Sequence, residues 1–150
     1  MVEAEERYDI WRIYIDPGSQ TGNIEPLVAK WLGRWGDQRV IKWYMHRPRE
    51  TGVAVHNYRR DIAKGEVRND GDEVFTQHIR NSVKQKLPTK DENNPKLTLY
   101  KLGKEHPDSP NKIDAAAAWV LSWECRLDAI EQDATHAPSR SIKHTDMRDE

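Results

Sequence analysis

Cysteine is almost absent from the chain, because Cys125 is the only one among 150 residues. A single cysteine excludes an internal disulfide and cysteine-cluster zinc sites, and its place inside an apolar segment indicates a small filler rather than a nucleophile. No apolar run approaches the ~18 residues of a membrane-spanning helix. The acidic start, MVEAEERYD, lacks the apolar segment of a signal peptide. We therefore expect a cytoplasmic protein without a membrane partner.

Several catalytic motifs are also missing. The sequence has no GxxxxGK[ST] phosphate loop and no GxSxG elbow, which argues against a P-loop ATPase and an α/β-hydrolase. The six histidines form no HxxxH or HExxH pair. His78 lies between Phe75 and Ile79, a setting more typical of a half-buried core histidine than of a catalytic group.

An excess of positive charge is likewise lacking, since the formal net charge is −1. Dedicated nucleic-acid binders usually carry a basic excess, so the overall charge gives no support to that class. Local basic groups do exist: Lys101, Lys104 and Lys112 precede Asp114, and arginines flank Pro48. Such groups are more often a solvated surface than a binding site.

The length suits one folded domain, which we expect over residues 1–131, followed by a disordered polar tail over residues 132–150. Apolar periodicity and turn signals predict strands at 10–15, 40–44 and 97–102, helices at about 23–35, 49–64, 72–84 and 110–129, and a polar loop at 87–95. The first strand, helix and second strand form a βαβ unit, so these two strands should be parallel. The prediction is an α/β layer fold with about three strands.

The segment KEHPDSPNKIDAAAAWVLSWECRL, residues 104–127, organises the chain. Ser109 is a suitable N-cap and Pro110 a suitable first helical residue, which places Asp114 in the second turn of a long apolar helix. Residues 115–118 are all alanine, so a bulky ligand or another backbone can approach Asp114 closely. One interpretation of Asp114 is a charge that stabilises the helix N-terminus. The other is a metal ligand.

Asp16 closes the first strand, and ligands of open α/β sheets bind at the carboxyl ends of strands. Two carboxylates, one at a strand end and one at a helix start, can together hold Mg²⁺ or Mn²⁺. Paired metals stabilise the attacking and leaving oxygens of a phosphodiester. The alternative for Asp16 is a simple Asp-Pro turn, and spacing alone does not choose between them.

Four segments follow one another along the chain: YIDPGSQTGNIEPLVAKWLGRWG, VIKWYMHRPRETGVAVHNYRRDIAKGEV, NDGDEVFTQHIRNSV and KEHPDSPNKIDAAAAWVLSWE. Over about residues 8–130 this series resembles the C-terminal half of the large terminase subunit of tailed phages, most closely the forms from actinobacterial phages and prophages. The resemblance depends on the strand ending in Asp-Pro, the GD…HIRN segment and the KIDAAAA helix. Each motif is moderately specific alone, and their shared order makes the match strong.

The resemblance implies a partial ribonuclease H-like layer fold and a nuclease that cuts phage DNA during genome packaging. By motif, Asp16 matches the family's second metal-binding carboxylate and Asp114 the third, so both are expected to be catalytic ligands of Mg²⁺ or Mn²⁺. Lys104 and Lys112 are expected near the DNA backbone. The implied partners are double-stranded DNA, the N-terminal terminase part with its ATPase motor, the portal and the small terminase subunit, in the bacterial host cytoplasm.

One departure from the family matters. The ATPase motor and the first nuclease strand with its leading carboxylate are missing, and Asp9 is too close to Asp16 in sequence to replace that carboxylate. We therefore expect a terminase fragment that is inactive alone and needs the missing N-terminal part. Two alternatives stay open: a non-catalytic fragment of a decayed or split terminase that binds DNA or the portal, and a degraded gene product without activity.

Overall fold

The computed structural model describes residues 6–18 and 24–134, and its elements form a mixed α/β fold, as the sequence predicts. They are β1 (Ile13–Ile15), α2 (Glu25–Trp35), β2 (Val40–Lys42), α3 (Pro48–Ala63), α4 (Glu73–Arg80), β3 (Val83–Lys90), β4 (Thr98–Gly103) and α5 (Asp114–Glu131). Among these residues no helix is both long and apolar enough to cross a membrane. Most of the predicted tail, from residue 135 onward, lies outside the described residues.

The predicted βαβ unit is confirmed. β1 and β2 pair in parallel, with Ile13 opposite Val40 and Ile15 opposite Lys42. α2 connects them and ends at Gly36, whose φ of 75° is a conformation that glycine adopts without strain. The core between α2 and the sheet is built on the buried side chains of Ile15, Val28 and Val40. This small unit holds the strand end that carries Asp16.

The second sheet differs from the prediction. We expected a helix to about residue 84 and a loop over residues 87–95, but α4 ends at Arg80 and β3 begins at Val83. β3 forms an antiparallel hairpin with β4, so the predicted third strand exists but pairs with β3 and not with β1 or β2. Contact with α3 favours the strand, because the buried side chains of Leu87 and Leu99 face Gly52.

The start of α5 is also corrected. The helix begins at Asp114 with Ile113 as its N-cap, not at Ser109 and Pro110. Ser109 is buried in the preceding loop, where its Oγ accepts a hydrogen bond from the N–H of Asn111 at 3.2 Å. Serine favours such local turns over helix when its hydroxyl bonds the backbone two residues ahead. Asp114 is therefore a first-turn residue.

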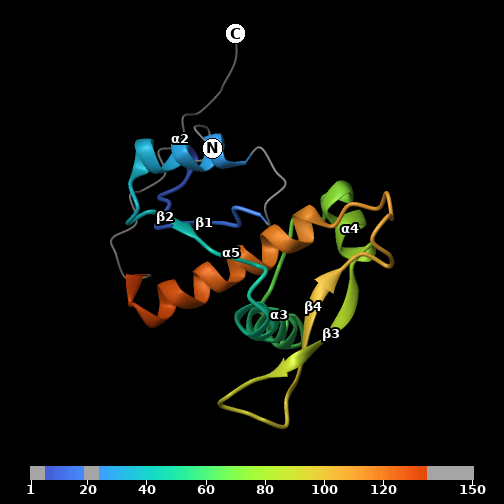
Figure 1. Ribbon diagram of the computed structural model, residues 1–150. Coiled ribbons are helices and arrows are strands. Elements are labelled where there is room, and N and C mark those ends of the chain that lie inside the picture. The colour runs from blue at the N-terminus through green and yellow to red at the C-terminus, as the bar shows by residue number, and fades with distance from the viewer. Residues whose placement is uncertain (1–5, 19–23, 135–150) are drawn as a thin grey trace.

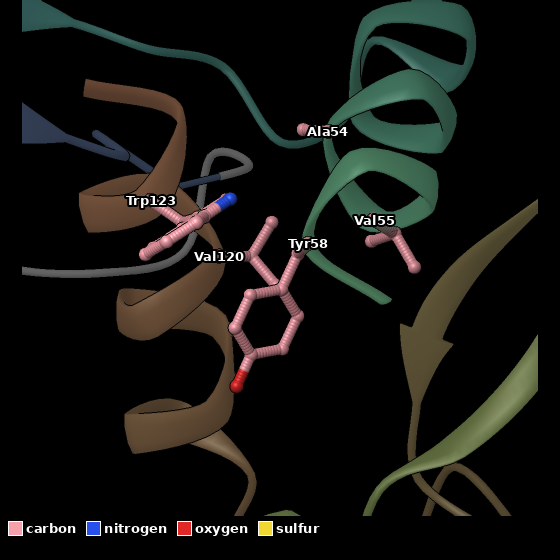
Figure 2. Close-up of a cluster of buried hydrophobic side chains, with 5 residues drawn as sticks. All are labelled: Ala54, Val55, Tyr58, Val120 and Trp123. Carbon is pink, nitrogen blue, oxygen red and sulfur yellow. The ribbon is translucent and has the colours of Figure 1, made fainter. Parts of the chain in front are cut away.

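The layers follow from the contacts between elements (Figure 1). α2 and α5 both contact the parallel sheet, α3 lies between α5 and the hairpin, and α4 packs against α5. Figure 2 shows the main core, where Val120 and Trp123 of α5 meet Ala54 and Tyr58 of α3. Val55 points from α3 toward the hairpin side. α5 is thus the element that joins the two halves of the fold.

A glycine sets the distance between α3 and the hairpin. A Cβ atom added to Gly52 would lie 2.8 Å from Leu99 Cβ and 3.0 Å from Leu87 Cδ1. Real side-chain atoms do not pack that closely, and overpacking of a core typically costs 1–3 kcal/mol. The hairpin therefore lies directly on the backbone of α3.

Candidate functional site

Asp16 follows β1 directly, as predicted, and its carboxylate is half-buried. Its Oδ1 accepts a hydrogen bond from the N–H of Gly18 at 3.1 Å and lies 3.5 Å from the N–H of Met45, in the loop after β2. The Asp-Pro turn is thus formed through one oxygen. Among the described residues none hydrogen-bonds to Oδ2, so this oxygen can accept a further partner.

Asp114 is the first residue of α5 and is exposed. The backbone around it is docked on α4: His78 Nδ1 accepts the N–H of Ala115 at 3.0 Å, and Asn81 Nδ2 donates to the carbonyl of Lys112 at 2.9 Å. Because His78 takes a backbone N–H at the helix start, it is the cap that α5 lacks in its own sequence. His78 of α4 and Asn81, which directly follows α4, therefore fix the backbone that presents Asp114.

This cap leads to a first prediction. His78→Ala should lower the free energy of unfolding by about 1 kcal/mol, the typical cost of losing a helix cap. The control His106→Ala removes an exposed side chain whose partner is the equally exposed Glu105, so it should change stability by less than about 0.5 kcal/mol. Urea unfolding followed by circular dichroism gives both values. Equal effects of the two variants would contradict the capping role.

Asp16 and Asp114 lie on elements that touch, because β1 packs against α5. Cys125 Sγ lies 3.7 Å from the carbonyl oxygen of Arg12, and the hydroxyl of Tyr14 donates to Asp128. Asp114 precedes Cys125 by eleven residues and Asp128 by fourteen, close to three and four turns of a 3.6-residue helix. Asp114 is therefore on the same side of α5 as the two residues that contact the β1 segment, about 16–21 Å along the helix from them.

The structure does not bring a complete metal site together. Among the described residues no group of three or more His, Cys, Asp or Glu side chains could hold a metal ion. No described residue is hydrogen-bonded to both Asp16 and Asp114. The two carboxylates thus offer oxygen ligands from neighbouring elements, and further ligands are needed to complete a site.

The two predicted DNA-contacting lysines differ in their surroundings. Lys104 is half-buried, and its Nζ donates to the carbonyl of Ser109 at 2.9 Å, so it stabilises the loop before α5. Lys112 is exposed, two residues before Asp114. Lys112 is therefore the better placed of the two to meet a ligand from solvent.

A second pair of carboxylates, which the sequence analysis missed, lies on α5 beneath β1. Glu124 Oε2 is buried without a hydrogen-bond partner among the described residues. Burial, and then the charge of Asp128 one turn away, raise the pKa of Glu124 to about 7. Burial and the hydrogen bond to Asp128 also raise the pKa of Tyr14 above its usual range. The i, i+4 spacing of Glu124 and Asp128 is the sequence feature from which this pair of neighbouring carboxylates could have been predicted.

The raised pKa of Glu124 gives a pH prediction. Between about pH 4.5 and 7 the folded protein holds a proton that the unfolded chain releases, so stability falls as pH rises through this range. Partial solvent access reduces the effect, and we expect Glu124→Gln to be more stable than wild type at pH 8 by about 1–2 kcal/mol. The matched control is Glu131→Gln, an exposed position on the same helix. Urea unfolding at pH 5 and pH 8 measures the difference, and a wild-type stability that rises with pH over this range would contradict it.

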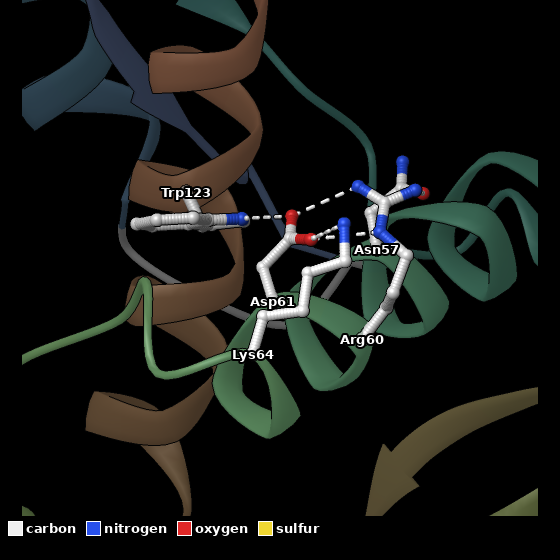
Figure 3. A network of polar contacts seen from close by, with 5 residues as sticks. All are labelled: Asn57, Arg60, Asp61, Lys64 and Trp123. Carbon is white, nitrogen blue, oxygen red and sulfur yellow. Dashed lines mark hydrogen bonds and ion pairs between the residues drawn. The ribbon is translucent and has the colours of Figure 1, made fainter.

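Asp61 is the most buried acidic side chain described, with 1% exposure. Figure 3 shows its carboxylate between the two helices: it accepts the indole N–H of Trp123 at 3.0 Å and the guanidinium of Arg60 at 2.7 and 2.9 Å. Lys64 lies 3.7 Å away. The Arg60 hydrogen bond is the main reason that the pKa of Asp61 falls to about 2. With every oxygen occupied, Asp61 joins α3 to α5 and is not open to a ligand.

An open groove lies beside α5. It has a volume of about 620 Å³ and is lined mainly by apolar atoms of Phe75, Ala118 and Trp119, with Arg68 and Asp70 at its edge. The rings of Phe75 and Trp119 meet edge to face with centroids 4.2 Å apart. The small residues 115–118 were expected to leave room beside Asp114, and Ala115 and Ala118 do line this groove, but the groove itself was not predicted.

No family model, no curated protein and no solved structure matches the chain.

Proposed function

We propose that this protein is the C-terminal part of a large terminase nuclease domain with a ribonuclease H-like fold, which cuts phage DNA with Mg²⁺ or Mn²⁺ during genome packaging. The sequence motifs are the origin of the proposal. The structural observation that supports it most is the setting of Asp114: an exposed carboxylate at the first turn of a core helix, on the same side of that helix as the residues that contact the β1 segment.

The proposed chemistry needs oxygen ligands at one sheet edge. Asp16 offers its Oδ2 there, while Oδ1 stays in the turn with Gly18. Asp114 offers both oxygens from a helix start, whose partial positive charge favours an anion. A metal bound there would supply Lewis-acid activation of a water and charge neutralisation on the phosphate. Asp16 and Asp114 would supply part of its ligands, and the exposed Lys112, two residues before Asp114, would neutralise a neighbouring phosphate.

Because further carboxylates are required, the protein is proposed to work with the N-terminal terminase part, which carries the motor and the first acidic strand. The test is plasmid nicking. The chain alone should nick supercoiled plasmid weakly or not at all in Mn²⁺, and a mixture with a terminase polypeptide that ends after its first acidic nuclease strand should nick it. Lack of nicking by a mixture in which the two polypeptides demonstrably associate would overturn the proposal.

A second candidate is a module that binds DNA or the portal without cutting. The lysine-rich hairpin β3–β4 favours it, because such a surface binds phosphates whether or not a metal site is complete. A gel shift of duplex DNA that is equal in EDTA and in Mn²⁺, together with no nicking in the mixture, is the result expected for this candidate.

A further inference from the structure

The hairpin β3–β4 carries a charge that contrasts with the rest of the protein. Residues 83–104 contain six lysines and two acidic residues, a net charge of +4, whereas the whole chain has −1 and the remainder therefore −5. One of the two acids, Glu92, is already paired with Arg49 at 2.7 Å. The positive charge is thus concentrated on the β3–β4 hairpin.

The strand register collects part of this charge on one face. Lys84 lies opposite Leu102, Lys86 opposite Tyr100 and Lys90 opposite Thr98. Residues directly opposite one another share a face, and alternate residues of a strand share a face. Leu87 and Leu99, which contact α3, belong to the other face. The three lysines and Tyr100 therefore share the face opposite to Leu87 and Leu99. Part of this face also meets α3, because Leu102 packs against the core between α3 and α5.

The three lysines on this face are exposed. None of Lys84, Lys86 and Lys90 forms an ion pair with an acidic side chain among the residues that the structure describes. Lys84 Nζ instead lies 5.0 Å from the ring centre of Tyr100, a cation–π contact that leaves its charge available to a phosphate.

A groove continues this surface toward α3. It has a volume of about 290 Å³ and lies between α3 and β4, lined in part by His56, Arg59, Thr98 and Tyr100. Arg59 is exposed and adds another positive charge beside the aromatic ring. Lysines can also protect a strand edge from pairing with other strands. That role needs no tyrosine ring and no cationic groove beside it.

We propose that this face of the hairpin, centred on Lys84, Lys86, Lys90 and Tyr100, binds the phosphate backbone of duplex DNA. The inference rests on the proposed function in taking DNA as the ligand, but it requires neither a metal nor cleavage. It places the main DNA contact on the hairpin, in addition to the contact expected at Lys112.

The test is the salt dependence of binding to a fluorescent duplex in EDTA. Each lysine that neutralises a phosphate contributes about 0.9 to the slope of log affinity against log salt, so Lys84→Gln with Lys86→Gln should reduce the slope by about two. The matched control, Lys30→Gln with Lys42→Gln, removes equal charge from exposed positions on α2 and β2 and should leave the slope unchanged. Lys84→Arg with Lys86→Arg should retain it.

Three results would overturn the inference: no binding by wild type at low salt, an unchanged slope in the hairpin variant, or an equal reduction in the control. Tighter binding of duplex RNA through the same lysines would also overturn the assignment to DNA. A measurement without variants supports it: DNA should protect Lys84, Lys86 and Lys90 from acetylation, and should leave Lys30 and Lys42 reactive. Because the binding assay excludes metal, the hairpin can bind DNA even if the reconstituted pair fails to nick plasmid. Equally, the pair can nick plasmid even if the hairpin lysines do not bind DNA.

Discussion

Asp114→Asn is expected to lower Mn²⁺-dependent plasmid nicking by the reconstituted terminase pair about 100-fold or more. The substitution keeps the size of the side chain and removes the negative charge that holds a hard divalent cation. Loss of a metal ligand removes several kcal/mol of transition-state stabilisation, and each 1.36 kcal/mol is a factor of ten in rate. Asp114 is exposed, so the fold itself should tolerate asparagine.

The matched control is Asp108→Asn, which changes an exposed acidic residue in the loop just before α5. We expect it to cut at nearly the wild-type rate. Asp16→Asn should behave like Asp114→Asn, with some added loss of stability because Asp16 Oδ1 holds the turn to Gly18. Wild-type nicking by Asp114→Asn, in a mixture that still associates, would remove Asp114 from the metal site.

Asp61→Ala should have the largest effect on stability, a loss of about 2–3 kcal/mol in the free energy of unfolding. The change leaves the indole N–H of Trp123, a buried residue, without its acceptor, and an unsatisfied buried donor costs about 1–3 kcal/mol. It also removes the bidentate partner of Arg60, whose contribution is smaller because that side chain is 44% exposed.

Urea unfolding at pH 7 measures this loss, with the exposed Asp37→Ala as the control expected to change stability by less than about 0.5 kcal/mol. The pH dependence provides a second check. Because the pKa of Asp61 is lowered to about 2, its contribution is present above about pH 4 and is lost as pH falls toward 2. A loss in Asp61→Ala that stays equal from pH 7 to pH 2 would contradict this account.

Local patterns in the sequence predicted the parallel unit well. β1, α2 and β2 each have a clear period and a turn residue at their ends, and Gly36 adopts the conformation expected after a helix. β3 was missed because Val83–Lys90 has only two aliphatic residues, Val83 and Leu87, among three lysines and a proline that argues against a strand. Its strand form depends on Leu87 packing beside Gly52, a contact between distant segments that no local pattern records.

The same distinction applies to the site. The position of Asp16 at a strand end followed from the strand pattern and is confirmed, whereas the start of α5 was placed too early because Ser109 and Pro110 imitate a helix start. The capping role of His78 and the burial of Glu124 depend on packing between elements. The metal-binding and DNA-binding roles stay predictions.

The most direct test of the central claim is paramagnetic broadening by substoichiometric Mn²⁺ in amide NMR spectra of the isolated chain. One shared metal site predicts that the amides of Gly18 and Ala115, next to the two carboxylates, broaden together at the same low Mn²⁺ concentration, and that Asp114→Asn abolishes both effects. Broadening at only one of the two amides, or at both but independently of Asp114, would contradict a metal held jointly by Asp16 and Asp114.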